Sequence, residues 1–342
     1  MKYIETKNAV GHVLCHDHTR IVKDQMKGVQ FKKGHVVTEE DIPLLLAMGK
    51  DRLYVWEVDE TKLHENDAAE RLVALCRNDF MREGEVSEGK IELFSEIGGL
   101  FHVDVTRLDA VNDIEEVMIA TRHSLTPVKK GDKLCGTRVI PLVIDKSRIE
   151  EAECIAGDKP LLEMLPFRLN TAGIVTTGNE VFHGRIQDTF TPVVIEKLKV
   201  YGIETVAHEV SDDEIEHIES AIRKVREKGV DVVLCTGGMS VDPDDMTPAA
   251  IKKNGANIVT YGAPVLPGAM FLLGYYEDGV PVMGLPGCVM YAKATIFDIV
   301  LPRIAAGVRV SRKDITTLGN GGLCLGCPVC TFPNCGFGKG SR

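Results

Sequence analysis

The sequence lacks the features that mark membrane-spanning and nucleic-acid-binding proteins. Of its 342 residues, 40 are Lys or Arg and 50 are Asp or Glu, so the formal net charge is −10. This acidic balance argues against nucleic acid and anionic membranes as partners, because both present dense negative charge. The most apolar region, residues 280–310, is interrupted by Lys293, Asp298 and Arg303, and no amino-terminal segment resembles a signal peptide. We therefore expect a soluble, cytoplasmic protein.

A disulfide framework is also not expected, because disulfides are rare in the cytoplasm. Four of the ten cysteines nevertheless lie in the last nineteen residues, at positions 324, 327, 330 and 335. Their spacing, C-x₂-C-x₂-C-x₄-C, is close to the bacterial ferredoxin run, and four thiolates also suit a tetrahedral zinc ion. We expect Cys324, Cys327, Cys330 and Cys335 to ligate either an iron–sulfur cluster or Zn²⁺. The alternative is a flexible tail of free thiols.

A chain of this length can form two or three domains with substantial cores. Residues 1–60 are predicted to form a β-rich region with a short helix at 39–48. Residues 61–166 are predicted to form an α+β middle region, in which 61–125 are mainly helical. An α/β domain is expected at 167–310, and a cysteine-rich tail at 311–342.

The α/β prediction rests on strands that alternate with helices from residue 167 onward. Strands are expected at 172–176, 204–209 and 230–236, a hairpin at 270–285, and a last helix at 289–305. Such alternation is typical of a mostly parallel sheet, in which ligands bind at the carboxyl ends of the strands. Glycine-bearing turns at 177–180, 236–240 and 284–287 follow predicted strands, so we expect them to share one pocket.

The stretch 230–245 is the most informative of these segments. A buried strand leads into Gly237-Gly238, then to three acids at positions 242, 244 and 245, and a helix is expected to start at Thr247-Pro248. A glycine turn followed by a helix amino end can bind an anion through backbone N–H groups. Acids beside it can hold a divalent cation. The alternative is an ordinary turn with solvated acids.

These turns carry a family resemblance. The motifs TTGNE (176–180), GGMS (237–240), LPG (266–268) and GLPG (284–287) resemble the molybdopterin-binding domain of molybdenum-cofactor biosynthesis, over about residues 168–308. That domain occurs in molybdopterin adenylyltransferases, molybdopterin molybdotransferases and gephyrin. The chain most resembles the molybdotransferase and gephyrin E-type branch. The resemblance implies a three-layer, mostly parallel α/β fold and, since this family commonly associates, a homo-oligomer.

The resemblance also implies a ligand and its binding residues. Molybdopterin, or its adenylated form, and molybdate would be the partners, with Mg²⁺ as a cofactor. Asp245, Asp212 and Glu180 match the acids that serve Mg²⁺ and the nucleotide or molybdate chemistry of the family. Asp245 would be a metal ligand. For Asp212, a charge in the first helical turn is an equally simple explanation. The cofactor-binding positions implied are Thr177, Gly178, Asn179, Asp188, Gly237, Gly238, Met239, Ser240, Pro267, Gly268, Pro286 and Gly287.

Some positions depart from the family pattern. The last motif reads GLPGCV, with Cys288 where molybdotransferases usually carry an amide, and the segment MDGYA is not found in the first hundred residues. The leading hypothesis is a molybdotransferase that inserts molybdate into (adenylated) molybdopterin. The alternative is a non-catalytic carrier or sensor of the cofactor with a metal-binding tail. A third is a pyrophosphatase-like relative.

Overall fold

The computed structural model describes residues 2–22, 26–55, 59–240, 242–243 and 245–340. Its contacts divide the chain into two compact units. The first comprises residues 1–96, 104–122 and 131–163, and the second comprises 97–103, 123–130 and 164–342. Residues 97–103, 123–130 and 164–166 of the expected middle region therefore belong to the second unit. Within the described ranges, no helix is long and apolar enough to cross a membrane.

The first unit contains more strand than the sequence suggested. Its main sheet is antiparallel, in the order β6-β7-β11-β9, and α2 packs on it through Leu72, Val73 and Cys76. The prediction that 61–125 is mainly helical is wrong, because three of these strands lie in that range. β6 has only three residues, too few for a clear pattern, whereas the alternation of β7, with Ile91, Leu93 and Ser95 buried, was overlooked.

The remaining elements of the first unit are small. A two-stranded pairing of β1 with β4 accompanies α1, a hairpin joins β2 to β3, and β5 pairs with β12. The bounds in this unit are β1 Lys2–Glu5, β2 His18–Val22, β3 Met26–Phe31, α1 Asp41–Ala47, β4 Arg52–Val55, β5 Lys62–His64, α2 Glu65–Cys76, β6 Met81–Glu83, β7 Lys90–Ser95, α3 Val105–Asn112, β9 Val117–Thr121, β11 Lys133–Val139, β12 Val143–Asp145 and α4 Lys146–Ala156.

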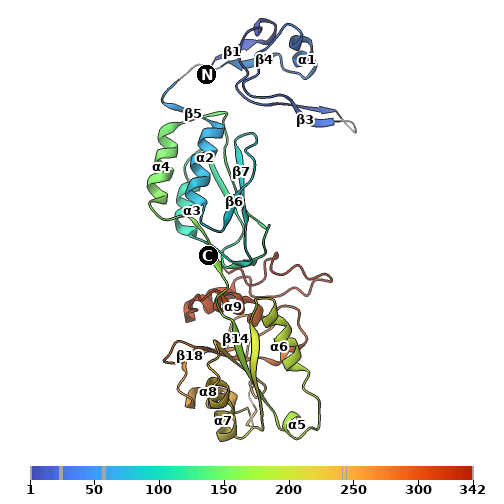
Figure 1. Cartoon of the computed structure of the whole chain (residues 1–342), viewed down its shortest axis with the longest axis vertical. Coiled ribbons are helices and arrows are strands. Elements are labelled where there is room, and N and C mark those ends of the chain that lie inside the picture. Colours follow the sequence, from blue (N-terminus) through green and yellow to red (C-terminus); the bar gives the residue numbers. More distant parts are fainter. Residues whose placement is uncertain (1, 23–25, 56–58, 241, 244, 341–342) are drawn as a thin grey trace. The chain divides into compact units, whose positions relative to one another are not determined.

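The second unit is organised around a six-stranded sheet in the order β15-β14-β16-β19-β18-β17. Figure 1 labels strands β14 and β18 of this unit and the helices α5 to α9. Strands β15, β14, β16 and β19 are parallel, and β18 runs antiparallel to both its neighbours. The expected mostly parallel sheet and the 270–285 hairpin are thus confirmed. The strand bounds are β14 Thr171–Thr177, β15 Glu204–Ser211, β16 Val232–Thr236, β17 Asn257–Tyr261, β18 Leu272–Tyr275 and β19 Pro281–Leu285. A separate sheet has the order β10-β8-β13, at Thr126–Val128, Gly99–Val103 and Leu162–Pro166.

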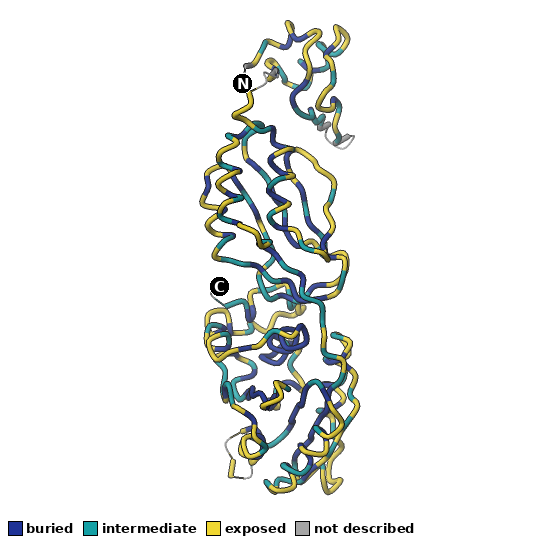
Figure 2. The backbone as a smooth tube through the Cα atoms, turned by 60° about the vertical axis from the view of Figure 1, so that its left-hand side comes forward, coloured by how far each residue is buried: buried dark blue, intermediate teal, exposed yellow. Residues whose placement is uncertain are grey.

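Helices cover both faces of the six-stranded sheet. In β16, Val232 and Leu234 face a core built with α6 and α9, whereas Val233 and Cys235 face a core built with α7 and α8. All five residues of β16 are buried, which explains its continuous apolar sequence. Figure 2 shows buried backbone, in dark blue, inside the second unit. The helices of this unit are α5 Asn179–Phe182, α6 Phe190–Lys199, α7 Ile215–Arg226, α8 Thr247–Lys253, α9 Ile296–Ala305 and α10 Arg312–Thr316, with short 3₁₀ turns η2 Gly287–Met290 and η3 Thr317–Gly319.

The last helix is shorter than the predicted 289–305. Thr295 caps α9 through a reciprocal capping box with Asp298, which fixes the start of the helix at Ile296. Residues 287–290 form a separate 3₁₀ turn instead. Residues 291–294, between the 3₁₀ turn and α9, are therefore not helical. Residues 292–294 line a cavity that is described below.

Candidate functional site

Loops at the carboxyl ends of the parallel strands enclose a cavity of about 410 Å³. The loop after β16 and the loop after β19 both contribute to its wall. The segment before β18 and the start of α6 complete it. The glycine-loop cavity, as we call it, is lined by Phe190, Gly237, Gly238, Met239, Ser240, Asp245, Ala269, Met270, Leu285, Pro286, Gly287 and Cys288.

The loop after β16 requires glycine for two reasons. Gly237 and Gly238 both have positive φ, at 84° and 54°, where L side chains are strained. A Cβ on Gly237 would also lie 2.2 Å from the Thr177 carbonyl oxygen, and one on Gly238 would lie 2.7 Å from Thr247 Oγ1. The two glycines therefore allow the loop to pack directly against the end of β14.

Thr177 holds this junction together. Its buried hydroxyl donates to the Thr236 carbonyl over 3.2 Å and lies 3.1 Å from Thr247 Oγ1. The first glycine motif thus supports the second, although residues 177–179 do not themselves line the cavity. The expectation of one pocket shared by three turns holds for 237–240 and 285–287, and the turn at 177–180 lies directly behind them.

Tyr261 is a contributor that the sequence reasoning missed. At the end of β17, its hydroxyl donates to the carbonyls of Met239 and Ser240, over 3.1 and 3.0 Å. Burial, with a contribution from the negative charge of Asp245, raises the pKa of Tyr261, so the phenol stays a donor. The only sequence signal was its place before Gly262, at a strand end. This tyrosine fixes the path of the glycine loop.

Of the acids predicted for catalysis, Asp245 is the one that lines the cavity. Its Oδ2 accepts a hydrogen bond of 2.9 Å from the backbone N–H of Asp242, while its own N–H donates to the Asp242 carbonyl. This turn holds the carboxylate at the cavity wall. Asp244, the third acid of the run, lies outside the described residues.

Asp212 is placed differently. Both of its carboxylate oxygens lie within 2.9 Å of His217 Nδ1, and Oδ1 also accepts from the Glu214 N–H near the start of α7. Hydrogen bonding to Asp212 raises the pKa of His217. The next residue, Asp213, is the one that reaches the first motif, accepting from the Asn179 N–H over 2.9 Å. The geometry thus matches the structural explanation of Asp212.

The other predicted residues lie around the cavity rather than in its wall. Glu180 is exposed on α5. Asp188 caps α6, since its Oδ1 accepts from the N–H groups of Phe190 and Thr191 over 2.9 and 3.0 Å. Gly268 packs so tightly against α9 that a Cβ would lie 2.5 Å from Ile296 Cγ2. Pro267 and Gly268 thereby position Ala269 and Met270, which do line the cavity.

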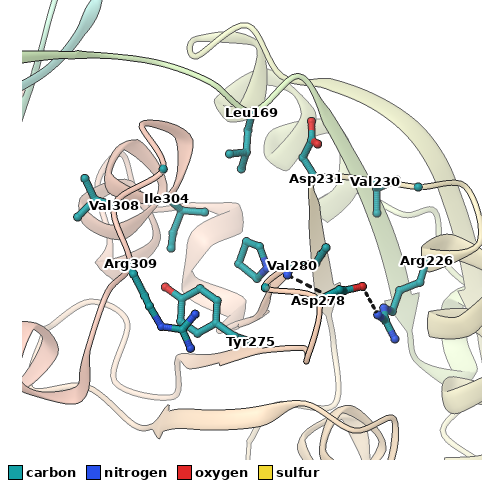
Figure 3. Close-up of a pocket in the computed structure, with 14 residues that line it drawn as sticks. Leu169, Arg226, Val230, Asp231, Tyr275, Asp278, Val280, Ile304, Val308 and Arg309 are labelled. Atoms are coloured by element: carbon teal, nitrogen blue, oxygen red, sulfur yellow. Dashed lines mark hydrogen bonds and ion pairs between the residues drawn. The ribbon is translucent and has the colours of Figure 1, made fainter.

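A second hollow, of about 520 Å³, opens at the opposite edge of the same sheet (Figure 3). Its charged side chains already have partners within the molecule. Arg226 donates to Asp278 over 2.8 Å, Arg309 stacks 4.3 Å from the ring of Tyr275, and Asp231 accepts from the N–H groups of Asn170 and Thr171. The charged side chains here stabilise the fold, because each of them already interacts with a neighbouring group of the protein.

The donor set of the glycine-loop cavity fits magnesium only together with a ligand. Among the described residues, no group of three or more His, Cys, Asp or Glu side chains is placed to hold a metal ion. Mg²⁺, however, commonly takes one or two protein carboxylates and completes its shell with phosphate and water. Asp245 is the only charged side chain among the described residues that line the cavity. A magnesium ion here would therefore depend on phosphate oxygens from a bound ligand.

The fold and the site together define the class of this domain. Residues 173–306 match the family described as a probable molybdopterin binding domain. This match confirms the resemblance of the glycine motifs to the molybdopterin-binding family over the α/β domain, which is less than half of the chain. Residues 3–57 match a separate domain of unknown function.

Individual relatives align over limited segments. A CinA-like protein of Mycobacterium tuberculosis is 37% identical over 82 residues, which are 24% of this chain and 19% of that protein. The chain thus spans about a fifth of the length of the curated relatives it matches. Among solved structures, the molybdopterin biosynthesis enzyme MoaB of Thermus thermophilus aligns at 24% identity and TM-score 0.36, covering 41% of this chain and 94% of that one. The protein CinA of Thermoplasma acidophilum aligns at 20% identity and TM-score 0.34, covering 40% and 98%.

Proposed function

We propose that the glycine-loop cavity binds molybdopterin or its adenylated form, and that the protein inserts molybdate into it as a molybdotransferase. The observation that supports this most is the convergence of two family glycine motifs and Asp245 on one cavity, inside the segment that matches the molybdopterin-binding family. The volume of about 410 Å³ is in the range of small-molecule sites.

The charge of the cavity favours a bound cation between the protein and its ligand. No Lys or Arg is found among the described lining residues, so a phosphate would contact backbone N–H groups of the glycine loop rather than basic side chains. Asp245 would repel that phosphate unless a cation lay between them. Magnesium would remove the repulsion and neutralise charge on the phosphate or molybdate oxygens.

Each part of the chain then has one task. The backbone at 237–240 binds the phosphate, and Gly237 and Gly238 let it approach. Tyr261 and Thr177 hold that loop in place. Asp245 orients the metal, and the apolar side chains of Phe190, Met270 and Leu285 exclude water from the pterin.

Substitution of Asp245 by Asn tests the proposal. The amide oxygen can keep the hydrogen bond from the Asp242 N–H, so the turn should survive while the charge is lost. With adenylated molybdopterin, molybdate and Mg²⁺, we expect turnover to fall at least about 100-fold, in line with losses of single electrostatic groups. Asp242→Asn is the matched control, because that exposed acid carries the same charge and does not line the cavity. Equal turnover in Asp245→Asn and the wild type would refute the role of Asp245.

A carrier or sensor is the second candidate, because Cys288 lines the cavity at the position where molybdotransferases usually carry an amide. Burial raises the pKa of this thiol, so it is a neutral group at the cavity wall. Tight binding of molybdopterin without turnover at any pH would support the carrier. Hydrolysis of ADP-ribose without pterin binding would instead support a pyrophosphatase-like activity.

A further inference from the structure

The four cysteines of the tail line a single cavity of about 520 Å³ in the second unit. We call it the cysteine cavity and define it by Cys324, Cys327, Cys330 and Cys335. Residues between and around them, including Gly326, Phe332 and Phe337, complete the wall. The tail thus closes on itself so that all four cysteines line one space, although the sequence separates the first and last by eleven positions.

The size of the cavity favours a cluster over one metal ion. A tetrahedral zinc ion needs four sulfurs about 2.3 Å from a single point, so it fills little space. Within the described residues, no group of three or more His, Cys, Asp or Glu side chains already converges on one point, so the cysteine side chains would have to turn towards any metal that they bind. A cavity of about 520 Å³ leaves space between the cysteines for a polynuclear centre, in which each thiolate binds a different iron or two thiolates bind each of two irons. We propose that the cysteine cavity binds an iron–sulfur cluster through these four cysteines.

The tail is held in place by the rest of the unit. Leu266 donates to the Gly322 carbonyl and accepts from the Cys324 N–H, both over 2.8 Å. Phe337 is buried in the same core as Ile299, and Cys324 and Cys335 pack against that core. The tail therefore has defined contacts with the rest of the unit at its start and near its end. A docked tail presents its thiols without the entropic cost of ordering them when the cluster binds.

The surroundings of the cavity also suit a negatively charged cluster. Three glycines, at positions 321, 326 and 336, line it, so backbone N–H groups can approach the cluster sulfurs closely. Phe332 and Phe337 supply an apolar wall that limits solvent access, and Lys293 supplies a positive charge. Hydrogen bonds, solvent exposure and nearby charge are the features by which proteins tune such clusters.

Two segments line both this cavity and the glycine-loop cavity. Pro267 lies at the cysteines, and Ala269 and Met270 lie at the glycine loops. The segment after β19 does the same, with Cys288 at the glycine-loop cavity and Ala292–Ala294 at the cysteines. Binding of a cluster would therefore act on the same two backbone segments that line the glycine-loop cavity.

Metal analysis of the full chain tests the proposal independently of the proposed function. Protein purified without oxygen, or reconstituted with ferrous iron and sulfide, should contain iron and acid-labile sulfide in equal amounts, about two or about four of each per chain. It should also show an iron–sulfur absorption and an electron paramagnetic resonance signal in one of its redox states.

Substitutions locate the cluster. Cys327 and Cys330 are exposed, so replacing either by Ala should leave the core intact, whereas Cys324 and Cys335 pack against the core. We expect Cys327→Ala and Cys330→Ala to lose most of the iron and sulfide, with unchanged circular dichroism. Cys154→Ala, at an exposed cysteine of the first unit, is the control and should keep both. Zinc as the only bound metal, no cluster after reconstitution, or full iron in Cys327→Ala would each overturn the proposal.

Discussion

Polar groups have different roles at the two ends of the parallel strands. We call the side of the six-stranded sheet where these strands begin its amino edge, and the side where they end its carboxyl edge. At the amino edge, around the hollow in Figure 3, Arg226 pairs with Asp278 and Arg309 stacks on Tyr275. That edge is defined by side chains that satisfy one another. At the carboxyl edge the wall combines backbone at glycine turns with mostly apolar side chains, and Thr177 and Tyr261 hold that backbone in place. The larger hollow is therefore the less suitable ligand site.

The comparison shows that cavity size is a weaker guide to function than whether the charged side chains around the cavity already have partners in the protein. A ligand at the amino edge would have to break ion pairs and stacking contacts before it gained any. A ligand at the carboxyl edge would meet exposed peptide groups and one carboxylate. This is the edge at which open parallel α/β sheets bind ligands.

The largest expected effect comes from adding one methyl group at Gly237, in the loop after β16. Gly237→Ala places a Cβ 2.2 Å from the Thr177 carbonyl, at a φ of 84°. Overpacking and the left-handed conformation together should lower the free energy of unfolding by about 3 kcal/mol and abolish molybdopterin binding. Urea unfolding and calorimetric titration with molybdopterin measure the two effects.

Gly279→Ala is the matched control at the amino edge. Gly279 has a φ of 87° in the turn between β18 and β19, and a Cβ there would meet nothing within 4 Å. Only the conformational cost applies, so we expect a loss of about 1 kcal/mol and unchanged binding. Equal losses in both variants would mean that the glycine loop is not crowded at the carboxyl edge.

An intermediate effect is expected from two acids that accept hydrogen bonds from backbone N–H groups. Asp188 accepts from the N–H groups of Phe190 and Thr191, and Asp231 accepts from those of Asn170 and Thr171. Replacing either acid by Ala should cost about 1–2 kcal/mol. Only Asp188→Ala should also weaken molybdopterin binding, because Phe190 lines the glycine-loop cavity. Equal affinity in the two variants would contradict this difference between the edges.

The pH dependence of the free energy of unfolding tests how these two acids stabilise the fold. Burial alone would raise the pKa of Asp188 and of Asp231, but hydrogen bonds lower it below the ordinary 3.8 in both. The unfolded chain therefore binds the proton first as the pH falls, so each acid stabilises the fold above that pH and its contribution is lost below it. The stability difference between wild type and each Ala variant should shrink as the pH falls through and below 3.8.

Much of the second unit could be predicted from its sequence. The continuous apolar run of β16 indicated burial on both faces, and the glycines at 237, 238 and 287 marked strand ends that the structure brings to one cavity. These features depend on local chemistry: apolar runs form buried strands, and positive φ requires glycine. The position of Asp245 at the cavity also follows from its place in the loop after β16.

Other features depend on contacts between distant residues, which no local pattern encodes. Asp212 and Asp213 are identical in chemistry, and only the fold decides that Asp213 reaches Asn179 while Asp212 meets His217. Tyr261 supports a loop more than twenty positions earlier in the chain. The short strand β6 of the first unit was missed because pairing with its neighbour, rather than periodicity, makes it a strand.

The smallest effect is expected from two tyrosine hydroxyls, one at each edge. Tyr261 donates to the Met239 and Ser240 carbonyls at the glycine loop, and the hydroxyl of Tyr275 accepts a hydrogen bond of 2.9 Å from the Val310 N–H. Tyr261→Phe and Tyr275→Phe should each lower the free energy of unfolding by about 1 kcal/mol.

Binding should separate these two variants. The loop freed in Tyr261→Phe must be ordered again by the ligand, so affinity for molybdopterin should fall about threefold to tenfold, which corresponds to about 1 kcal/mol. Affinity should be unchanged in Tyr275→Phe, because the Val310 segment lies at the opposite edge. Calorimetric titration of both variants measures this, and a weaker affinity in Tyr275→Phe than in Tyr261→Phe would place the ligand at the amino edge instead.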